Sequence, residues 1–168
     1  SLDAPGLQIL LCVEYDATGG DSILVDGFRV AHQLQQDDAS LYAALGQIEV
    51  TGIYKGDGSN LQACRPILRH DHEGRLIQVT FNNYDRAPMR LAEPQMTQLY
   101  SGIRYLDTLF NSSNFQWRYQ LEPGEMLVFD NWRLLHGRGA FHGKRRMAGA
   151  YLNREDYLSA LREHNLIN

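Results

Sequence analysis

The sequence predicts a mostly-β domain with two or three helices packed outside it, which fits a double-stranded β-helix, or jelly roll. Short apolar runs of strand length recur along the chain, and glycine, proline, asparagine or aspartate separates many of them. Three stretches are predicted to be helices: 28–45, 93–110 and 154–164. At 168 residues the chain is long enough for one domain with a sizeable core, so we propose no internal boundary.

The first apolar run, Leu7–Val13, is too continuous for an edge strand and is predicted to be a central strand buried on both faces. No helix or cap precedes it. Because a domain seldom begins with its central strand, we expect residues 1–168 to be a single domain that is N-terminally incomplete. Thr18–Ser22 follows as a turn whose two glycines permit positive φ and close backbone approach.

The middle of the chain alternates helices and strands. The 28–45 helix is interrupted at Asp37–Asp38, and Asp38 is placed to cap a second short helix. Residues 47–54 alternate like a strand, 55–60 form a loop, and 65–81 form a hairpin. The hairpin turn, 70–74, has the sequence HDHEG. Two histidines beside an aspartate invite a metal-site interpretation, but adjacent residues point in different directions, so a solvated turn is the better prediction.

The last third contains the chemistry that stands out. Trp117–Leu121 and Met126–Phe129 are predicted strands. The two leucines Leu134 and Leu135 then lead directly to His136. Nine positions later Arg145 and Arg146 head the strand-like run 147–152, and Asn153 is placed to cap the last helix. Two adjacent strands would place an imidazole, which suits a metal, and a guanidinium, which grips a carboxylate with two hydrogen bonds, in one cavity.

Residue type alone leaves plainer alternatives open. A lone histidine after an apolar run is more often a hydrogen-bonded core or rim residue, and an arginine pair is more often a solvated strand edge.

Composition excludes several classes of partner. The net charge is −4, and no Lys/Arg block exists beyond residues 144–146, so nucleic acid is not expected. No apolar run approaches the roughly 20 residues of a membrane span, and no targeting segment is visible. The two cysteines, Cys12 and Cys64, are predicted to be buried, reduced thiols of an intracellular protein, cytoplasmic or mitochondrial.

Four motifs in order carry a resemblance to a known family. They are PGLQILLC (5–12), TGGDSILVDGF (18–28), TFNNYDRA (80–87) and FDNWRLLHGR followed by GKRRMAGAYLNREDYL (129–158). Together they resemble the C-terminal half of the carnitine-pathway iron(II)/2-oxoglutarate dioxygenases, trimethyllysine dioxygenase and γ-butyrobetaine dioxygenase, within the taurine-dioxygenase-like group. The resemblance implies a jelly-roll fold and hydroxylation of a small trimethylammonium-bearing amino acid.

The same resemblance implies a role for five residues. His136 would be one ligand of iron(II) in a two-His, one-carboxylate triad. Arg145 and Ser22 would hold the far carboxylate of the co-substrate 2-oxoglutarate, with Arg146 on the other side of the strand. Asn82 would bind the substrate's carboxylate end, and Tyr151 would lie near its trimethylammonium group. Ascorbate as an auxiliary reductant and a homodimeric assembly remain open.

One departure from the family pattern matters. The other two iron ligands belong to a His-x-Asp motif upstream of the segment that matches residues 1–6, and no such motif occurs in this chain. We therefore expect residues 1–168 alone to bind iron weakly and to be inactive. Three hypotheses stay open: part of an enzyme, a non-catalytic 2-oxoglutarate-binding domain, and a truncated structural module.

The substrate is also open between two relatives. The longer match NNYDRA and the nine-residue step from His136 to Arg145 resemble the trimethyllysine enzyme more than the butyrobetaine enzyme.

Overall fold

The computed structural model describes residues 4–167, in which ten strands and four helices form two units. Among the described residues, one unit comprises residues 25–116, and the other comprises residues 4–24 together with residues 117–167. The predominance of strands with a few helices confirms the mostly-β prediction. None of the described helices is long and apolar enough to cross a membrane.

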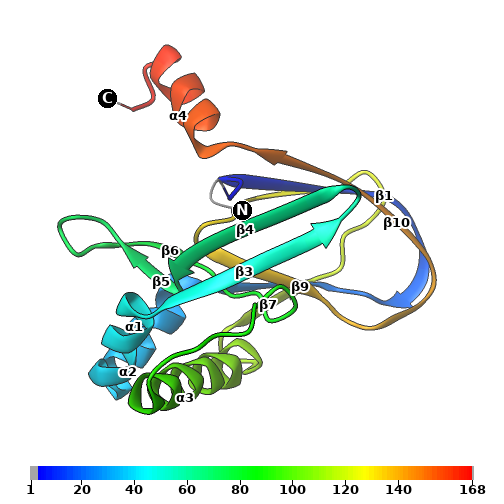
Figure 1. The fold of residues 1–168 in the computed structure, drawn as a ribbon. Coiled ribbons are helices and arrows are strands. Elements are labelled where there is room, and N and C mark those ends of the chain that lie inside the picture. The colour runs from blue at the N-terminus through cyan, green and yellow to red at the C-terminus, as the bar shows by residue number, and fades with distance from the viewer. Residues whose placement is uncertain (1–3, 168) are drawn as a thin grey trace. The chain divides into compact units, whose positions relative to one another are not determined.

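The terminal unit is built on the long strand β1, Leu7–Gly19. β1 lies in the middle of a three-stranded antiparallel sheet, between β10 (Phe141–Leu152) and β8 (Met126–Asp130) (Figure 1). The central position predicted for Leu7–Val13 is therefore confirmed. Burial on both faces is not: Val13 is 38% exposed, and burial concentrates at alternate residues such as Cys12, 1% exposed.

A β-bulge sets which side chains share a face of this sheet. Cys12 pairs with Met147 and Glu14 pairs with Arg146, so Val13 is an extra residue without a partner of its own. Side chains alternate along β10, and each β1 residue shares the face of its partner. We call the two sides the Cys12 face and the Glu14 face. The Cys12 face carries Gln8, Leu10, Cys12 and Tyr15 from β1, Phe129 from β8, and Arg145, Met147 and Tyr151 from β10.

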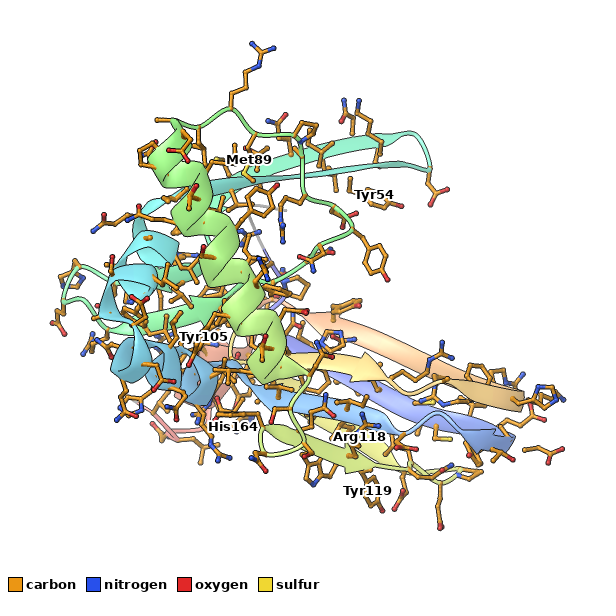
Figure 2. The ribbon with its side chains drawn as sticks, turned by 90° about the horizontal axis from the view of Figure 1, so that it is seen from below. Tyr54, Met89, Tyr105, Arg118, Tyr119 and His164 are labelled. Atoms are coloured by element: carbon orange, nitrogen blue, oxygen red, sulfur yellow. The ribbon has the colours of Figure 1, made fainter. Side chains whose placement is uncertain are left out.

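The second sheet has the order β7-β2-β9 and consists of Gln116–Tyr119, Ser22–Asp26 and Leu134–Arg138. β9 and β10 therefore belong to different sheets, which corrects the expectation that the strands of His136 and Arg145 are neighbours. β10 takes β1 as its hydrogen-bonding partner from end to end, whereas β9 pairs with β2 in the second sheet. Arg118 and Tyr119 project from β7 (Figure 2).

Helix α4, Arg154–Glu163, follows β10 and contains no buried residue. Arg154 ties its start to the sheet: the guanidinium lies 3.1 Å from Asp130 and 4.8 Å from the centre of the Trp132 ring. Asn153 occupies the predicted cap position, but its side chain makes no capping hydrogen bond.

The middle unit packs three helices with two hairpins. The helices are α1 (Gly27–Asp37), α2 (Ala39–Gln47) and α3 (Glu93–Phe110), and the hairpins are β3–β4 (Glu49–Gly56, Ser59–Pro66) and β5–β6 (Leu68–His70, Leu76–Val79). The core of this unit is made of fully buried leucines: Leu34, Leu45, Leu68, Leu99 and Leu106. Tyr105 projects from α3 (Figure 2), and its hydroxyl donates a hydrogen bond to Asp37 at the end of α1.

Several local predictions are confirmed in this unit. Asp38 separates α1 from α2 and caps α2, because its carboxylate accepts a hydrogen bond from the Leu41 amide at 2.9 Å. The HDHEG segment is a solvated turn: Asp71 accepts from the amides of Glu73 and Arg75, and the His72 side chain is 87% exposed. The expected loop at 55–60 is only a two-residue turn, since both strands of the β3–β4 hairpin continue through it. The prediction that both cysteines are buried is wrong for Cys64, which lies exposed on β4, and is confirmed for Cys12.

The packing of α3 against α2 is tight at Gly102, and this gives a testable prediction. A Cβ at Gly102 would lie 2.8 Å from Cγ of Leu45, which is fully buried and has no room to move. Helix propensity favours alanine over glycine by about 1 kcal/mol, but overpacking costs about 1–3 kcal/mol. We expect Gly102→Ala to lower the free energy of unfolding by about 1–2 kcal/mol in urea titrations, whereas Ser101→Ala, on the exposed side of α3, changes it by less than about 0.5 kcal/mol. An unchanged or higher midpoint for Gly102→Ala would contradict this packing.

Candidate functional site

Arg145 and Arg146 lie on opposite faces of β10, as predicted, and their surroundings differ. Arg146 is on the Glu14 face and lies 3.9 Å from the Glu14 carboxylate, which also binds Lys144 at 2.8 Å. The hydrogen bond from Lys144 is the first cause of the lowered pKa of Glu14, and the positive charges of Lys144 and Arg146 lower this pKa further. Arg145 is on the Cys12 face, is only partly exposed, and has no hydrogen bond or ion pair within residues 4–167.

The two-glycine turn after β1 lies against the Arg145 side chain. Gly19 and Gly20 adopt φ values of 77° and 85°, which glycine tolerates best. A Cβ on Gly20 would lie 3.3 Å from Cδ of Arg145 and 3.1 Å from Cβ of Phe141. The Gly20 amide donates to the Ala140 carbonyl at 2.9 Å, which fixes the turn. Gly20 therefore lets the backbone approach Arg145, whereas Gly19 is needed because a Cβ there would lie 2.4 Å from the Ala140 carbonyl oxygen.

Ser22 starts β2 directly after this turn and is 5% exposed. Two residues separate it from Gly19, so the chain links Ser22 covalently to the backbone that touches Arg145. The Asp21 carbonyl accepts a hydrogen bond from the Gly139 amide at 3.0 Å, which holds the turn to the β9–β10 connection. The structure thus brings the predicted serine and arginine to the same corner of the terminal unit.

His136 lies on β9 and contacts the other sheet through Phe129. The two ring centres are 5.1 Å apart at a tilted angle, and Phe129 is 5% exposed. His136 keeps an exposed side, yet the protein around the rest of the ring lowers its pKa below 6.5 by burial. A lowered pKa keeps the imidazole neutral near pH 7, and the neutral ring is the form that binds a metal.

The described residues do not complete a metal site. Within residues 4–167, no three His, Cys, Asp or Glu side chains come together in a way that would hold a metal ion. A two-His, one-carboxylate centre requires three protein ligands, and His136 is the one predicted from the sequence. A neutral imidazole fits such a centre, and the assignment of His136 as a ligand stays a prediction.

Tyr151 lies on the Cys12 face, 62% exposed, directly opposite Gln8 on β1. The Gln8 amide Nε2 donates a long hydrogen bond of 3.4 Å to the Tyr151 hydroxyl. Sequence reasoning missed Gln8, although a signal was present. It is the one strongly polar side chain in the apolar run 7–13, and such a residue in a central strand needs an explanation.

Asn82 belongs to the middle unit, and its side chain is engaged in a turn. Its amide oxygen accepts from the Tyr84 backbone amide at 2.9 Å, and its Nδ2 donates to Asp85 at 2.7 Å. This is the turn-forming use of asparagine. Its assignment to the substrate carboxylate stays a prediction.

A cavity of about 200 Å³ opens beside Asn82 within the middle unit. Its wall includes Arg65, whose pKa is lowered by burial and then by the nearby Arg69 charge, and Thr80, whose buried hydroxyl has no hydrogen-bond partner. The remaining wall combines apolar residues from β3, β4 and the segment that follows β6 with the charged Asp85 and Arg86, and Asn82 is one of the lining residues.

Residues 1–151 match the model of the family "Taurine catabolism dioxygenase TauD, TfdA family". The chain belongs to this family. Matched curated relatives include trimethyllysine dioxygenase of the yeast Meyerozyma guilliermondii, 37% identical over 99% of the chain, and human γ-butyrobetaine dioxygenase, 32% identical over 94%. A relative named mitochondrial trimethyllysine dioxygenase from chicken is 33% identical over 94%. The chain spans 42%, 43% and 39% of their respective lengths, so it corresponds to well under half of each TauD/TfdA relative.

Solved structures confirm the fold of this TauD/TfdA chain. An asparagine oxygenase solved with Fe(II), hydroxyasparagine and succinate superposes with a TM-score of 0.70 at 20% identity, over 91% of this chain and 47% of that one. PvcB, an iron- and α-ketoglutarate-dependent oxygenase, gives a TM-score of 0.64 at 19% identity, over 92% and 54%. The jelly-roll fold predicted from the sequence is therefore confirmed.

The pKa of His136 can be tested in the metal-free chain. We expect the Hε1 proton of His136 to titrate with a midpoint below 6.5 in NMR spectra recorded from pH 5 to 8, because burial disfavours the charged ring. Comparison with His136→Gln identifies the signal among the six histidines. A midpoint at or above 6.5 would show that the ring is fully hydrated or faces a carboxylate.

Proposed function

We propose that this chain is the co-substrate-binding portion of an iron(II)- and 2-oxoglutarate-dependent dioxygenase. The observation that carries the proposal is Arg145: a partly buried guanidinium without a protein partner among the described residues, against which a glycine turn is packed. An unpaired cation in such a position costs free energy that an anionic ligand recovers. Family membership agrees with this reading, since the relatives are named dioxygenases.

The residues take the following roles in the proposal. Arg145 holds the far carboxylate of 2-oxoglutarate through two parallel hydrogen bonds, and the Ser22 hydroxyl donates a third. His136 contributes a neutral imidazole to iron(II), which when bound activates oxygen for hydroxylation of a C–H bond. In this proposal His136 is the ligand that the chain contributes, and the other two ligands and the complete reaction belong to a longer polypeptide, since residues 4–167 contain no three-ligand cluster.

The proposed substrate is N6,N6,N6-trimethyllysine, hydroxylated at carbon 3 in carnitine biosynthesis. Two fungal trimethyllysine dioxygenases are 37% identical to the chain, whereas the matched butyrobetaine enzymes and the animal trimethyllysine dioxygenases are both 32–33% identical. Tyr151 is assigned to the trimethylammonium group, whose positive charge is attracted by a ring face, and Asn82 to the carboxylate end. γ-Butyrobetaine is the alternative substrate.

A second candidate is a non-catalytic domain that binds 2-oxoglutarate without metal. The observation in its favour is the lack of a three-ligand cluster in the described residues. It shares the Arg145 site and differs in predicting that dicarboxylate binding is independent of iron.

An anaerobic titration separates the two candidates. The longer polypeptide that contains this chain is titrated with iron(II), with and without 2-oxoglutarate, while Trp fluorescence and the visible charge-transfer band of chelated iron are recorded. The chain alone does not separate the candidates, because both expect it to bind 2-oxoglutarate with little or no iron. Saturable iron binding that strengthens with 2-oxoglutarate and disappears in His136→Ala supports the dioxygenase. Binding of 2-oxoglutarate that is indifferent to iron supports the non-catalytic domain. Binding of neither ligand contradicts both.

The Arg145 assignment has a matched control in its neighbour. We expect Arg145→Gln to weaken 2-oxoglutarate binding by about ten- to a hundredfold, because a charge-assisted hydrogen-bond pair contributes about 1.5–3 kcal/mol. Arg146→Gln removes the same charge from the Glu14 face, and we expect less than about a threefold change. Isothermal titration calorimetry measures both. Equal losses in the two variants would mean that only net charge attracts the ligand.

The glycine turn gives an independent prediction. A methyl group at Gly20 presses on Arg145 and Phe141, so we expect Gly20→Ala to weaken 2-oxoglutarate binding by roughly tenfold as the guanidinium is displaced. Gly74→Ala is the control: Gly74 has a similar φ of 80°, but nothing lies within 4 Å of the added Cβ. The control bears the same backbone strain and should keep its affinity. If both variants bind alike, the contact with Arg145 is unimportant.

A further inference from the structure

A row of three side chains crosses the Cys12 face of the first sheet. Register places Gln8 of β1 opposite Tyr151 of β10 on one side and opposite Phe129 of β8 on the other. Directly opposed residues on one face have Cβ atoms about 4.5–5.5 Å apart, so their side chains touch. Phe129 in turn contacts the His136 ring, with ring centres 5.1 Å apart. Gln8 therefore joins Tyr151 to the residue that packs on the proposed iron ligand.

Gln8 is a poor residue for stability at this place. It is 5% exposed, its Oε1 is buried without a hydrogen-bond partner in the described structure, and its Nε2 makes a single long bond. A buried amide oxygen left unbonded opposes folding, and an apolar side chain of the same length would avoid that cost. The neighbouring strand residues Leu7, Ile9, Leu10 and Leu11 are all apolar. The presence of the amide is thus explained by the hydrogen bond that its nitrogen, Nε2, makes.

Nε2 of Gln8 donates this hydrogen bond to the hydroxyl of Tyr151. Tyr151 is 62% exposed, and an exposed tyrosine on a strand would otherwise be free to change its χ1 rotamer. The bond from Gln8 restrains the position of the hydroxyl and hence the χ1 rotamer, which sets where the ring lies. A cation is attracted to the face of an aromatic ring that lies close to it, so the position of the ring decides whether a quaternary ammonium group is bound.

We propose that Gln8 is a positioning residue that fixes the Tyr151 ring for the trimethylammonium group of the substrate. The inference rests on the proposed function for the identity of the cation, and it adds the residue that orients the ring. Gln8 contributes nothing directly to the cation, because its oxygen is enclosed by protein. It acts through the hydrogen bond, so the bond and not the charge or size of the side chain is what matters.

A double-mutant cycle tests the bond. The variants are Gln8→Met, which keeps the length of the side chain, Tyr151→Phe, which keeps the ring, and the two combined. We expect each single variant to weaken trimethyllysine binding about three- to tenfold, and the double variant to lose no more than either one, because each already breaks the same bond. Additive losses would overturn the proposal.

Two controls separate positioning from a merely structural role. The carbon isostere of trimethyllysine, with a tert-butyl group in place of trimethylammonium, has no charge to orient toward a ring, so its affinity should be equal in wild type and Gln8→Met. The midpoint of thermal unfolding should stay the same or rise in Gln8→Met, since an unbonded amide is removed. A fall in the midpoint with equal losses for both ligands would mean that Gln8 serves packing alone.

The mobility of the Tyr151 ring can be measured without a ligand. In ¹³C-labelled tyrosine NMR spectra, we expect the Tyr151 ring to become more mobile in Gln8→Met, and an unchanged ring signal would overturn the proposal. The outcome is distinguishable from failure of the proposed function. If 2-oxoglutarate binds through Arg145 but wild type binds no trimethyllysine, the Gln8 inference is wrong while the co-substrate assignment stands.

Discussion

The pairing of β1 with β10 is the constraint on which the terminal unit depends. The two strands are matched from Leu7 with Leu152 to Gly19 with Phe141, so the register of the whole sheet is set by a single contact surface. Because side chains alternate, this register decides which residues of β10 share a face. A slip of one residue would move Arg145 to the solvent side and bring Arg146 to the glycine turn. The contact between Gly20 and Arg145 and the position of Tyr151 opposite Gln8 both follow from this one alignment.

Much of this arrangement was predictable from the sequence, for reasons that are local. The apolar stripe of 93–110 and the aspartate at position 38 determine a helix and a helix boundary from short-range periodicity and capping. The alternation that separates Arg145 from Arg146 is equally local. The jelly-roll prediction and the roles of individual residues came instead from four motifs in order, whose resemblance to a family carries information that periodicity does not.

What the sequence did not predict depends on partners distant in the chain. The sequence around Gln8 does not indicate that Gln8 faces Tyr151, since 143 positions separate the two residues. The same holds for the contact between Phe129 and His136, which joins two sheets, and for the assignment of β9 and β10 to different sheets. Asn82 shows the opposite case: its side chain is satisfied by neighbours within three residues, so local turn chemistry explains it without a ligand.

The bulge at Val13 has a consequence for how the length of this sheet can vary. Because Val13 has no partner, its loss would leave Cys12 opposite Met147 and Glu14 opposite Arg146, with every other side chain on its present face. The position is therefore a tolerated deletion point in an otherwise rigid strand. Relatives that are one residue shorter here could keep an intact ligand corner, and an alignment gap at this place would record a straightened strand and not a damaged site.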